Sequence, residues 1–229
     1  MTTRGDIRRR IEEIGIIPSI RTHTVDEAKF AAETLTRAGI PIVEVTMTVP
    51  DAVSAIKHLT SEMPDVIVGA GTIFDAEMAK LCVQAGAQFL TSPGLDMEIV
   101  DLALEQGVLA IPGALTPTEV TLGVKGGADF IKIFPVGHLG GASYIHALRG
   151  QFADVLFIAA GGVNQQSAGE FVTAGAAVIG VGPELVPKKA IEHRDDHWIT
   201  ELARRFLHSV HDARKQRAHR HDAVDHRER

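Results

Sequence analysis

Cysteine is almost missing from this 229-residue chain, and so are long apolar segments and any excess of positive charge. The single Cys82 excludes an internal disulfide bond and is typical of a protein in the reducing cytoplasm. A net charge of −6 at pH 7 argues against nucleic acid or an anionic membrane as the main partner. No apolar run is long enough to cross a membrane, and the charged N-terminus lacks the apolar centre of a signal peptide. We therefore expect a cytoplasmic protein that binds neither nucleic acid nor membranes.

A glycine that ends a helical pattern, followed by a short apolar strand, recurs along the chain. These glycines are Gly39, Gly86, Gly107, Gly127 and Gly175, at positions where helices commonly end in a left-handed residue. They are separated by one or two multiples of a period of roughly 20 residues, which is the length of a compact βα unit. The pattern predicts eight strands, at residues 16–21, 41–46, 66–70, 88–91, 108–111, 129–133, 155–159 and 177–181.

Eight βα units with short connections predict an α/β fold, a single-domain (β/α)8 TIM barrel over residues 1–212. An open flavodoxin-like or Rossmann sheet is the alternative, but it would need fewer strands and a switch in strand order. Residues 6–14 carry isoleucines at helical spacing and predict an extra N-terminal helix across the barrel's N-terminal opening. Residues 213–229 are almost wholly charged and polar, so we expect a disordered tail, which cannot fix the geometry of a metal site on its histidines.

Two charged residues interrupt apolar strands. Lys132 lies within Phe130–Phe134, where a buried ammonium is costly unless it is paired or gives up its proton. A neutral amine is a nucleophile that can form a Schiff base with a ketone. Glu44 lies within Ile42–Val45, and a buried carboxyl group can serve as a general acid or base. The alternatives are that Lys132 reaches solvent at the strand end, and that Glu44 is a structural ion-pair partner of Lys132 or Arg21.

The carboxyl ends of barrel strands meet at one opening, where active sites form. Arg21 ends the first predicted strand, whereas Glu44 and Lys132 lie in the second and the sixth. An amine and a carboxyl group at this opening suit Schiff-base carbon–carbon chemistry. Gly161-Gly162 and Gly180–Gly182 end the last two strands, where backbone N–H groups of barrels bind phosphate. Such glycines also form ordinary turns, so this signal is weak by itself.

Six short motifs follow one another along the chain: Glu44–Thr46, Gly69–Thr72, Ser92–Gly94, Ile111–Gly113, Lys132–Pro135 and Gly161–Val163. In this order and spacing they resemble 2-keto-3-deoxy-6-phosphogluconate (KDPG) aldolase, whose wider family includes 4-hydroxy-2-oxoglutarate (KHG) aldolase. The resemblance extends over about residues 9–210, which is nearly the whole predicted barrel. It implies a class I aldolase that needs neither metal nor cofactor and is usually a homotrimer.

The resemblance also implies a substrate and a role for individual residues. Lys132 matches the Schiff-base lysine, and Glu44 matches the general acid and base. Thr72 matches the residue that holds the pyruvate carboxylate, in a pocket shaped by the Pro93-Gly94 turn and Phe134. The implied reaction cleaves KDPG into pyruvate and glyceraldehyde 3-phosphate.

Two positions depart from the family's pattern. Thr48 stands where several members have an arginine that pairs with the substrate carboxylate, and Arg21 is the candidate to supply that charge instead. Pro183 stands where many members have a serine that contacts phosphate, and proline lacks both the hydroxyl and the backbone N–H. An unphosphorylated or short 2-keto-4-hydroxy acid such as KHG is therefore the alternative substrate. A non-catalytic trimeric barrel is the alternative outside enzymes, but the retention of Lys132 and Glu44 speaks against it.

Overall fold

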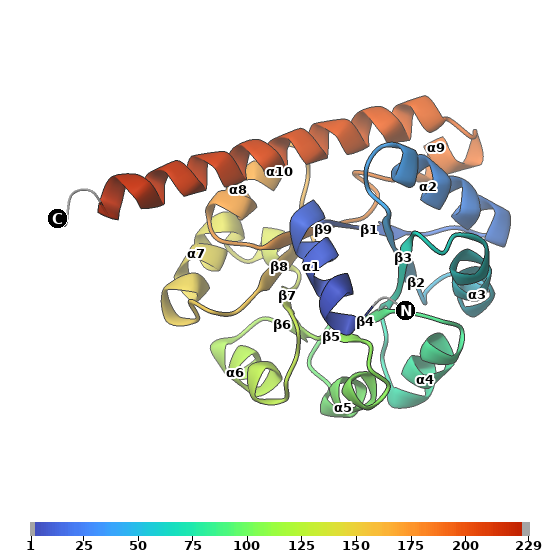
Figure 1. Cartoon of the computed structure of the whole chain (residues 1–229), viewed down its shortest axis with the longest axis horizontal. Coiled ribbons are helices and arrows are strands. Elements are labelled where there is room, and N and C mark those ends of the chain that lie inside the picture. The colour runs from blue at the N-terminus through green and yellow to red at the C-terminus, as the bar shows by residue number, and fades with distance from the viewer. Residues whose placement is uncertain (1–2, 226–229) are drawn as a thin grey trace.

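Nine parallel strands form one nearly closed sheet in the computed structural model, which describes residues 3–225 and the side chains of residues 3–218. Their order around the barrel is β5-β4-β3-β2-β1-β9-β8-β7-β6, and the helices surround them (Figure 1). The strands are β1 (Ile16–Ile20), β2 (Ile42–Thr46), β3 (Ile67–Gly71), β4 (Phe89–Thr91), β5 (Leu109–Ile111), β6 (Gly113–Ala114), β7 (Ile131–Ile133), β8 (Phe157–Ala160) and β9 (Val178–Val181).

The helices that connect and flank the strands follow the predicted alternation. They are α1 (Arg4–Ile14), α2 (Val25–Arg37), α3 (Ala52–Glu62), α4 (Ala76–Gln84), α5 (Met97–Glu105), α6 (Pro117–Lys125), α7 (Gly141–Gln151), α8 (Ala168–Thr173), α9 (Lys188–Glu192) and α10 (Asp196–Asp225), with the 3₁₀ turn η1 (Val136–His138) after β7. The glycines of the sequence repeat all have positive φ, between 70° and 115°, at helix ends. The repeat was therefore interpreted correctly.

All eight predicted strands are present, with boundaries shifted by one or two residues. The ninth strand, β6, was not predicted, and it is separated from β5 only by Pro112, which has no N–H to donate to a ladder. Because β5 and β6 stand at the two ends of the strand order, the sheet closes on itself at this point. Neighbouring strands follow the chain order without a topological switch, which excludes the open Rossmann-like alternative.

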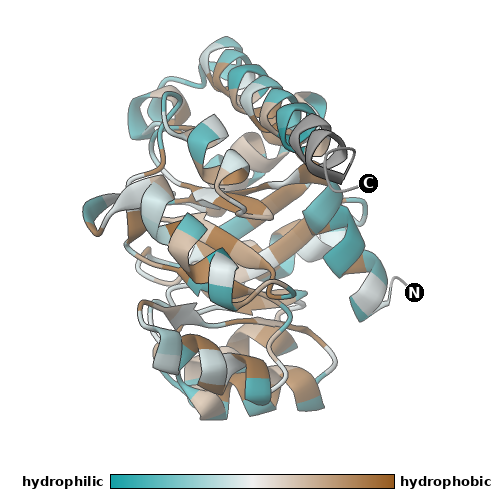
Figure 2. Cartoon of the chain, turned by 90° about the vertical axis from the view of Figure 1, so that its left-hand side faces the viewer, coloured by the Kyte–Doolittle hydropathy of each residue, from teal (hydrophilic) through white to brown (hydrophobic). Residues whose placement is uncertain are grey.

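The core consists of the strands and the inner faces of the helices. Every residue of β2 and β3 is buried, as expected of parallel strands that are covered on both faces. Figure 2 shows the hydrophobic residues gathered on the strands, whereas hydrophilic residues are frequent on the outer helices. The carboxyl ends of the strands are thereby held in one rigid ring, and the loops after them can present side chains to a common opening.

Helix α1 lies across the N-terminal end of the barrel, where the sequence placed it. Thr3 caps its first turn, and Ile7 and Ile11 are buried against the strands. The helix contacts β1, β5 and β9, and Figure 1 shows it in front of the barrel's centre. An ion pair of 2.7 Å between the Arg4 guanidinium and the Asp129 carboxylate fixes its start. This opening of the barrel is therefore closed.

Helix α10 continues well beyond the predicted end of the domain. Residues 213–225 are helical, so the prediction of a disordered tail from residue 213 on is corrected for this part. Ala213 is buried, and Arg214 donates hydrogen bonds to carbonyl groups at the end of α1 and to the carbonyl of Ala177. These contacts offset the entropy cost of ordering a polar segment, and composition alone does not reveal them. Residues 226–229, with one of the tail histidines, lie outside the described part.

None of the helices within residues 3–225 combines the length and the apolarity that a membrane span requires. Among the side chains of residues 3–218, no three from His, Cys, Asp or Glu are grouped so that they could hold a metal ion. Cys82 is buried in α4, and burial raises the pKa of its thiol to about 12. It is a packing residue of the core rather than a nucleophile.

Candidate active site

A pocket of about 670 Å³ opens at the carboxyl ends of the barrel strands. Nine of the residues predicted for the site line it: Arg21, Glu44, Thr72, Pro93, Lys132, Phe134, Gly161, Gly162 and Gly182. Gly94 does not line it, but its carbonyl accepts a 2.6 Å hydrogen bond from Ser92 Oγ, which closes the turn that presents Pro93. Thr48 and Pro183, the two departures from the family's pattern, line the pocket as well.

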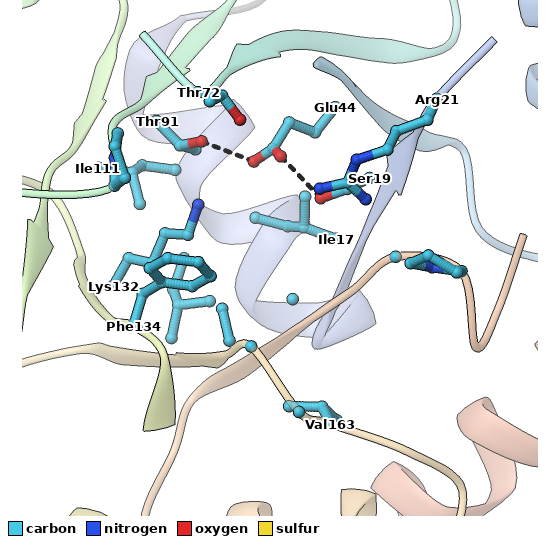
Figure 3. Close-up of a pocket in the computed structure, with 18 of the residues that line it drawn as sticks. Ile17, Ser19, Arg21, Glu44, Thr72, Thr91, Ile111, Lys132, Phe134 and Val163 are labelled. Atoms are coloured by element: carbon cyan, nitrogen blue, oxygen red, sulfur yellow. Dashed lines mark hydrogen bonds between the residues drawn. The ribbon is translucent and has the colours of Figure 1, made fainter. Parts of the chain in front are cut away.

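The Glu44 carboxylate projects from β2 into this pocket and is only 4% exposed. Ser19 Oγ donates a hydrogen bond of 2.7 Å to Oε1, and Thr91 Oγ1 donates one of 2.7 Å to Oε2 (Figure 3). A Cβ on Gly71 would lie 2.3 Å from Oε1, so only glycine leaves room for the carboxylate there. Within the described part of the chain, Glu44 forms an ion pair with neither Lys132 nor Arg21. The interpretation of Glu44 as a salt-bridge partner is therefore wrong.

Lys132 is the central residue of β7, between the buried Ile131 and Ile133. Its side chain is half-buried rather than fully buried, because its end reaches the open pocket, as Figure 3 shows. Nζ lies 5.3 Å from the centre of the Phe134 ring, which is within the range of a cation–π contact. The apolar stem is thus fixed in the strand while the amine faces the space in front of Glu44.

Thr72 has a backbone conformation that β-branched residues rarely adopt, with a φ of 62°. It follows the end of β3, directly after the Gly71 that makes room for Glu44, and it lines the pocket. Conformations of this kind cost roughly 1–3 kcal/mol and gather at functional sites. The strained backbone and the family's motif therefore both indicate Thr72 as a functional residue.

Close approaches surround the glycines at the ends of β8 and β9, and at Gly161 the approaching atom belongs to the backbone, so that glycine is required there. A Cβ on Gly161 would lie 2.8 Å from the Cα of Pro135, and a Cβ on Gly182 would lie 2.9 Å from Nη1 of Arg21. Arg21 therefore lies beside the loop after β9. In Figure 3 it is on the opposite side of Glu44 from Lys132. Gly182 thus lies with Arg21 at one end of the pocket, whereas Gly161 lies against Phe134, whose ring would be 2.9 Å from a Cβ on that glycine.

The sequence analysis missed Ser19 and Thr91, the two hydroxyl donors to Glu44. One signal for Ser19 was available: it is a polar residue in the apolar β1, two positions before Arg21 and hence on the same face. Its register partner on β2 is Glu44 itself. Register between strands is a property of the fold, so the contact could not be predicted before the strands were paired.

Comparison with known proteins adds the family. The family model "KDPG and KHG aldolase" matches residues 7–202. The 2-dehydro-3-deoxy-phosphogluconate aldolase of Treponema pallidum is 32% identical over 200 residues, which are 87% of this chain and 95% of the relative. The KHG/KDPG aldolase of Escherichia coli K12 is 34% identical over 189 residues, covering 82% of this chain and 89% of the relative.

Solved structures agree with the sequence relatives. KDPG aldolase from Legionella pneumophila, with pyruvate captured as a covalent carbinolamine intermediate, has a TM-score of 0.82 at 31% identity and covers 89% of this chain and 97% of that one. KDPG aldolase of Zymomonas mobilis with 3-phosphoglycerate has a TM-score of 0.79 at 30% identity, with coverages of 87% and 94%. The family that the six motifs predicted is confirmed: this chain belongs to the KDPG and KHG aldolases.

Proposed function

We propose that this chain is a class I aldolase that cleaves KDPG into pyruvate and glyceraldehyde 3-phosphate through a Schiff base on Lys132. Membership of the family supports the reaction. One observation carries the assignment of residues: the Lys132 amine and the Glu44 carboxylate face a single pocket at the carboxyl ends of the strands. In this proposal β5 and β6 are two halves of one strand, so that the fold is a (β/α)8 TIM barrel with α1 as the extra helix.

The reaction begins when the neutral Nζ of Lys132 attacks the C2 ketone, and loss of water gives an iminium ion. Glu44, through a water molecule, takes the proton of the C4 hydroxyl. The C3–C4 bond breaks, its electron pair forms the enamine, and C4 leaves as the aldehyde. Glu44 then returns a proton to C3, and hydrolysis of the iminium releases pyruvate and the free amine. Because the iminium ion is the electron sink, this scheme uses no metal and no cofactor.

The two ends of the pocket suit the two ends of the substrate. At the end near Lys132, Thr72 and Phe134 would hold the pyruvate part, together with the turn at Pro93. Along the ends of β8 and β9, the backbone N–H groups of Gly161-Gly162 and of Gly182, which lies beside Arg21, would bind the phosphate. The glycines allow a ligand to approach the backbone closely, since no Cβ covers the N–H groups.

Arg21 is proposed to bind an anionic group of the substrate. The sequence analysis expected it to replace the missing arginine at Thr48 and to bind the carboxylate. Its position beside Gly182 instead favours the phosphate. We expect Arg21→Ala to raise the KM for KDPG about tenfold, since a hydrogen bond to a charged group contributes roughly 1.5–3 kcal/mol. Pyruvate affinity, measured as the pyruvate concentration that gives half-maximal borohydride trapping, should stay unchanged, whereas a tenfold loss of it would support the carboxylate role.

A second substrate is favoured by one observation. Pro183 and Glu184 line the pocket beside Gly182. Pro183 has no backbone N–H to donate to a phosphate group, and the negative charge of the Glu184 carboxylate would repel it. KHG or another unphosphorylated 2-keto-4-hydroxy acid would avoid this repulsion. Steady-state kinetics on KDPG and KHG decide between them. A kcat/KM at least tenfold higher for KHG would make it the substrate, and the opposite ratio would retain KDPG.

The first test of the proposed function is mass spectrometry after incubation with pyruvate and borohydride. Reduction of the Schiff base should leave a stable adduct on Lys132, and Lys132→Ala should remain unmodified. Absence of an adduct on the folded parent protein would contradict the mechanism and support the non-catalytic barrel.

We also propose that the chain forms homotrimers in the cytoplasm. A protein cage designed by fusing symmetric oligomeric domains matches with a TM-score of 0.84 at 27% identity. Large apolar side chains are exposed on the single chain, among them Phe74 at 61% and Leu122 at 48%. Subunit contacts would cover such residues. Light scattering on the purified protein should give three times the chain mass of 24.6 kDa, and a monomer mass would contradict this.

A further inference from the structure

We propose that Ser19 and Thr91 are positioning residues that hold the Glu44 carboxylate in the orientation required for proton transfer. The proposal rests on the aldolase function above and adds two residues to its machinery. Neither residue is part of the six motifs by which the family was identified in the sequence.

The geometry of the contacts carries the inference. Each carboxylate oxygen of Glu44 accepts one hydrogen bond of 2.7 Å, from Ser19 on one side and from Thr91 on the other (Figure 3). The final torsion of a glutamate side chain is broad and only weakly restricted by itself. Two donors from different strands, with the bare backbone of Gly71 beneath, restrict that torsion. The plane of the carboxylate is therefore set by β1 and β4 as well as by β2.

The chemistry of the donors suits a group that gains and loses a proton. A carboxylate has about four acceptor positions, so two hydrogen bonds leave one on each oxygen for water or substrate. A hydroxyl can both donate and accept, whereas ammonium and guanidinium groups only donate. When Glu44 is protonated, one of the two hydroxyl groups can rotate and accept a hydrogen bond from the carboxyl group. The new buried O–H then has a hydrogen-bond partner.

A purely structural role is the alternative, and the same barrel holds a matched example of one. Thr46 Oγ1 donates a hydrogen bond of 2.9 Å to the Ile20 carbonyl, which also links β1 and β2. Thr46 is as buried as Thr91 but does not touch Glu44. Thr46→Val therefore removes a comparable hydroxyl without disturbing the carboxylate.

The test separates proton transfer from Schiff-base formation. With pyruvate alone in D2O, the enamine takes up deuterium at the methyl group, which NMR follows, and borohydride trapping reports the adduct on Lys132. We expect Thr91→Val and Ser19→Ala each to slow deuterium uptake about tenfold or more while trapping stays at the parent level. Thr91→Ser keeps the hydroxyl and should keep most of the rate, and Thr46→Val should match the parent. In a Glu44→Gln background, Thr91→Val should cause no further loss, because the hydroxyl acts through the carboxylate.

Other outcomes overturn the proposal in distinguishable ways. Unchanged uptake in both Thr91→Val and Ser19→Ala would show that the carboxylate needs no such support. An equal loss in Thr46→Val, or a loss of trapping together with uptake, would indicate a structural role only. A further tenfold loss in the Glu44→Gln background would show that Thr91 acts on the substrate itself. If the parent protein traps no pyruvate, the proposed function fails, and the positioning role, which rests on it, fails with it.

Discussion

The two ends of the barrel consist of the same strands but of opposite kinds of residues. At the N-terminal end, α1 covers the strands with apolar side chains such as Ile7 and Ile11, and charges are paired at the rim. At the C-terminal end, the strands lead into an open pocket that contains Glu44, Lys132 and the strained Thr72. The comparison teaches that the N-terminal end stabilises the fold, whereas the C-terminal end contains buried charge and backbone strain, which lower stability but which the reaction requires.

The largest effect should come from Lys132→Ala at the open end. Loss of the nucleophile should reduce cleavage of KDPG by about a thousandfold or more. The free energy of unfolding should change by about 1 kcal/mol or less, since the amine is half-buried and gives up a cation–π contact with Phe134 at 5.3 Å. A coupled assay for pyruvate and urea unfolding followed by circular dichroism measure the two quantities. A folded variant that retains a tenth of the activity would contradict the assignment.

The reverse pattern is expected for Ile11→Ala at the closed end. Ile11 is fully buried on the inner face of α1, so its truncation should cost roughly 2–5 kcal/mol of unfolding free energy. At a temperature where the variant is folded, kcat and KM should equal those of the parent. A large change in KM would show that the two ends are coupled. Exposed Arg8, on the outer face of α1, offers a control, because Arg8→Ala should change neither quantity noticeably.

Arg214→Ala should act on the closed end more weakly. The guanidinium donates to the last carbonyls of α1, those of Glu12 and Glu13, and to Ala177. Because other parts of α1 stay buried, we expect a loss of about 1–3 kcal/mol. Hydrogen exchange should show faster opening of α1 and of α10 than of the strands. Unchanged exchange in both helices would mean that Arg214 is not what holds them together.

The smallest effect on stability, and one of opposite sign, is expected for Thr72→Gly at the open end. Glycine adopts a φ of 62° without strain, so the variant should be more stable by up to about 1 kcal/mol. The lost hydroxyl should at the same time weaken pyruvate binding. Thermal unfolding and the pyruvate concentration needed for half-maximal borohydride trapping, both measured on the same preparation, test whether stability is gained at the expense of pyruvate binding. A less stable variant would show that the conformation of Thr72 carries no strain.

The features that local sequence determines were predicted well. Apolar runs and the glycine repeat gave the eight strands, and charges within apolar strands marked Lys132 and Glu44. Features that depend on segments meeting in space were not predicted. Ser19 contacts Glu44 only because of the register between β1 and β2, and Arg214 meets its carbonyl partners on α1 and at Ala177 only once these segments have come together. Polar uncharged residues and polar helices are too common in sequences to indicate such contacts by themselves.

The pairing of the first strand with the last has a consequence for protein synthesis. β1 leaves the ribosome early, but β9, one of its two neighbours, ends only at Val181. During most of translation the growing sheet therefore has an unpaired edge and an incompletely covered apolar interior, both of which favour aggregation. Until the last quarter of the chain has left the ribosome, β1 can pair with strands of other proteins. A chaperone that prevents this would have to keep β1 unpaired until β9 is available.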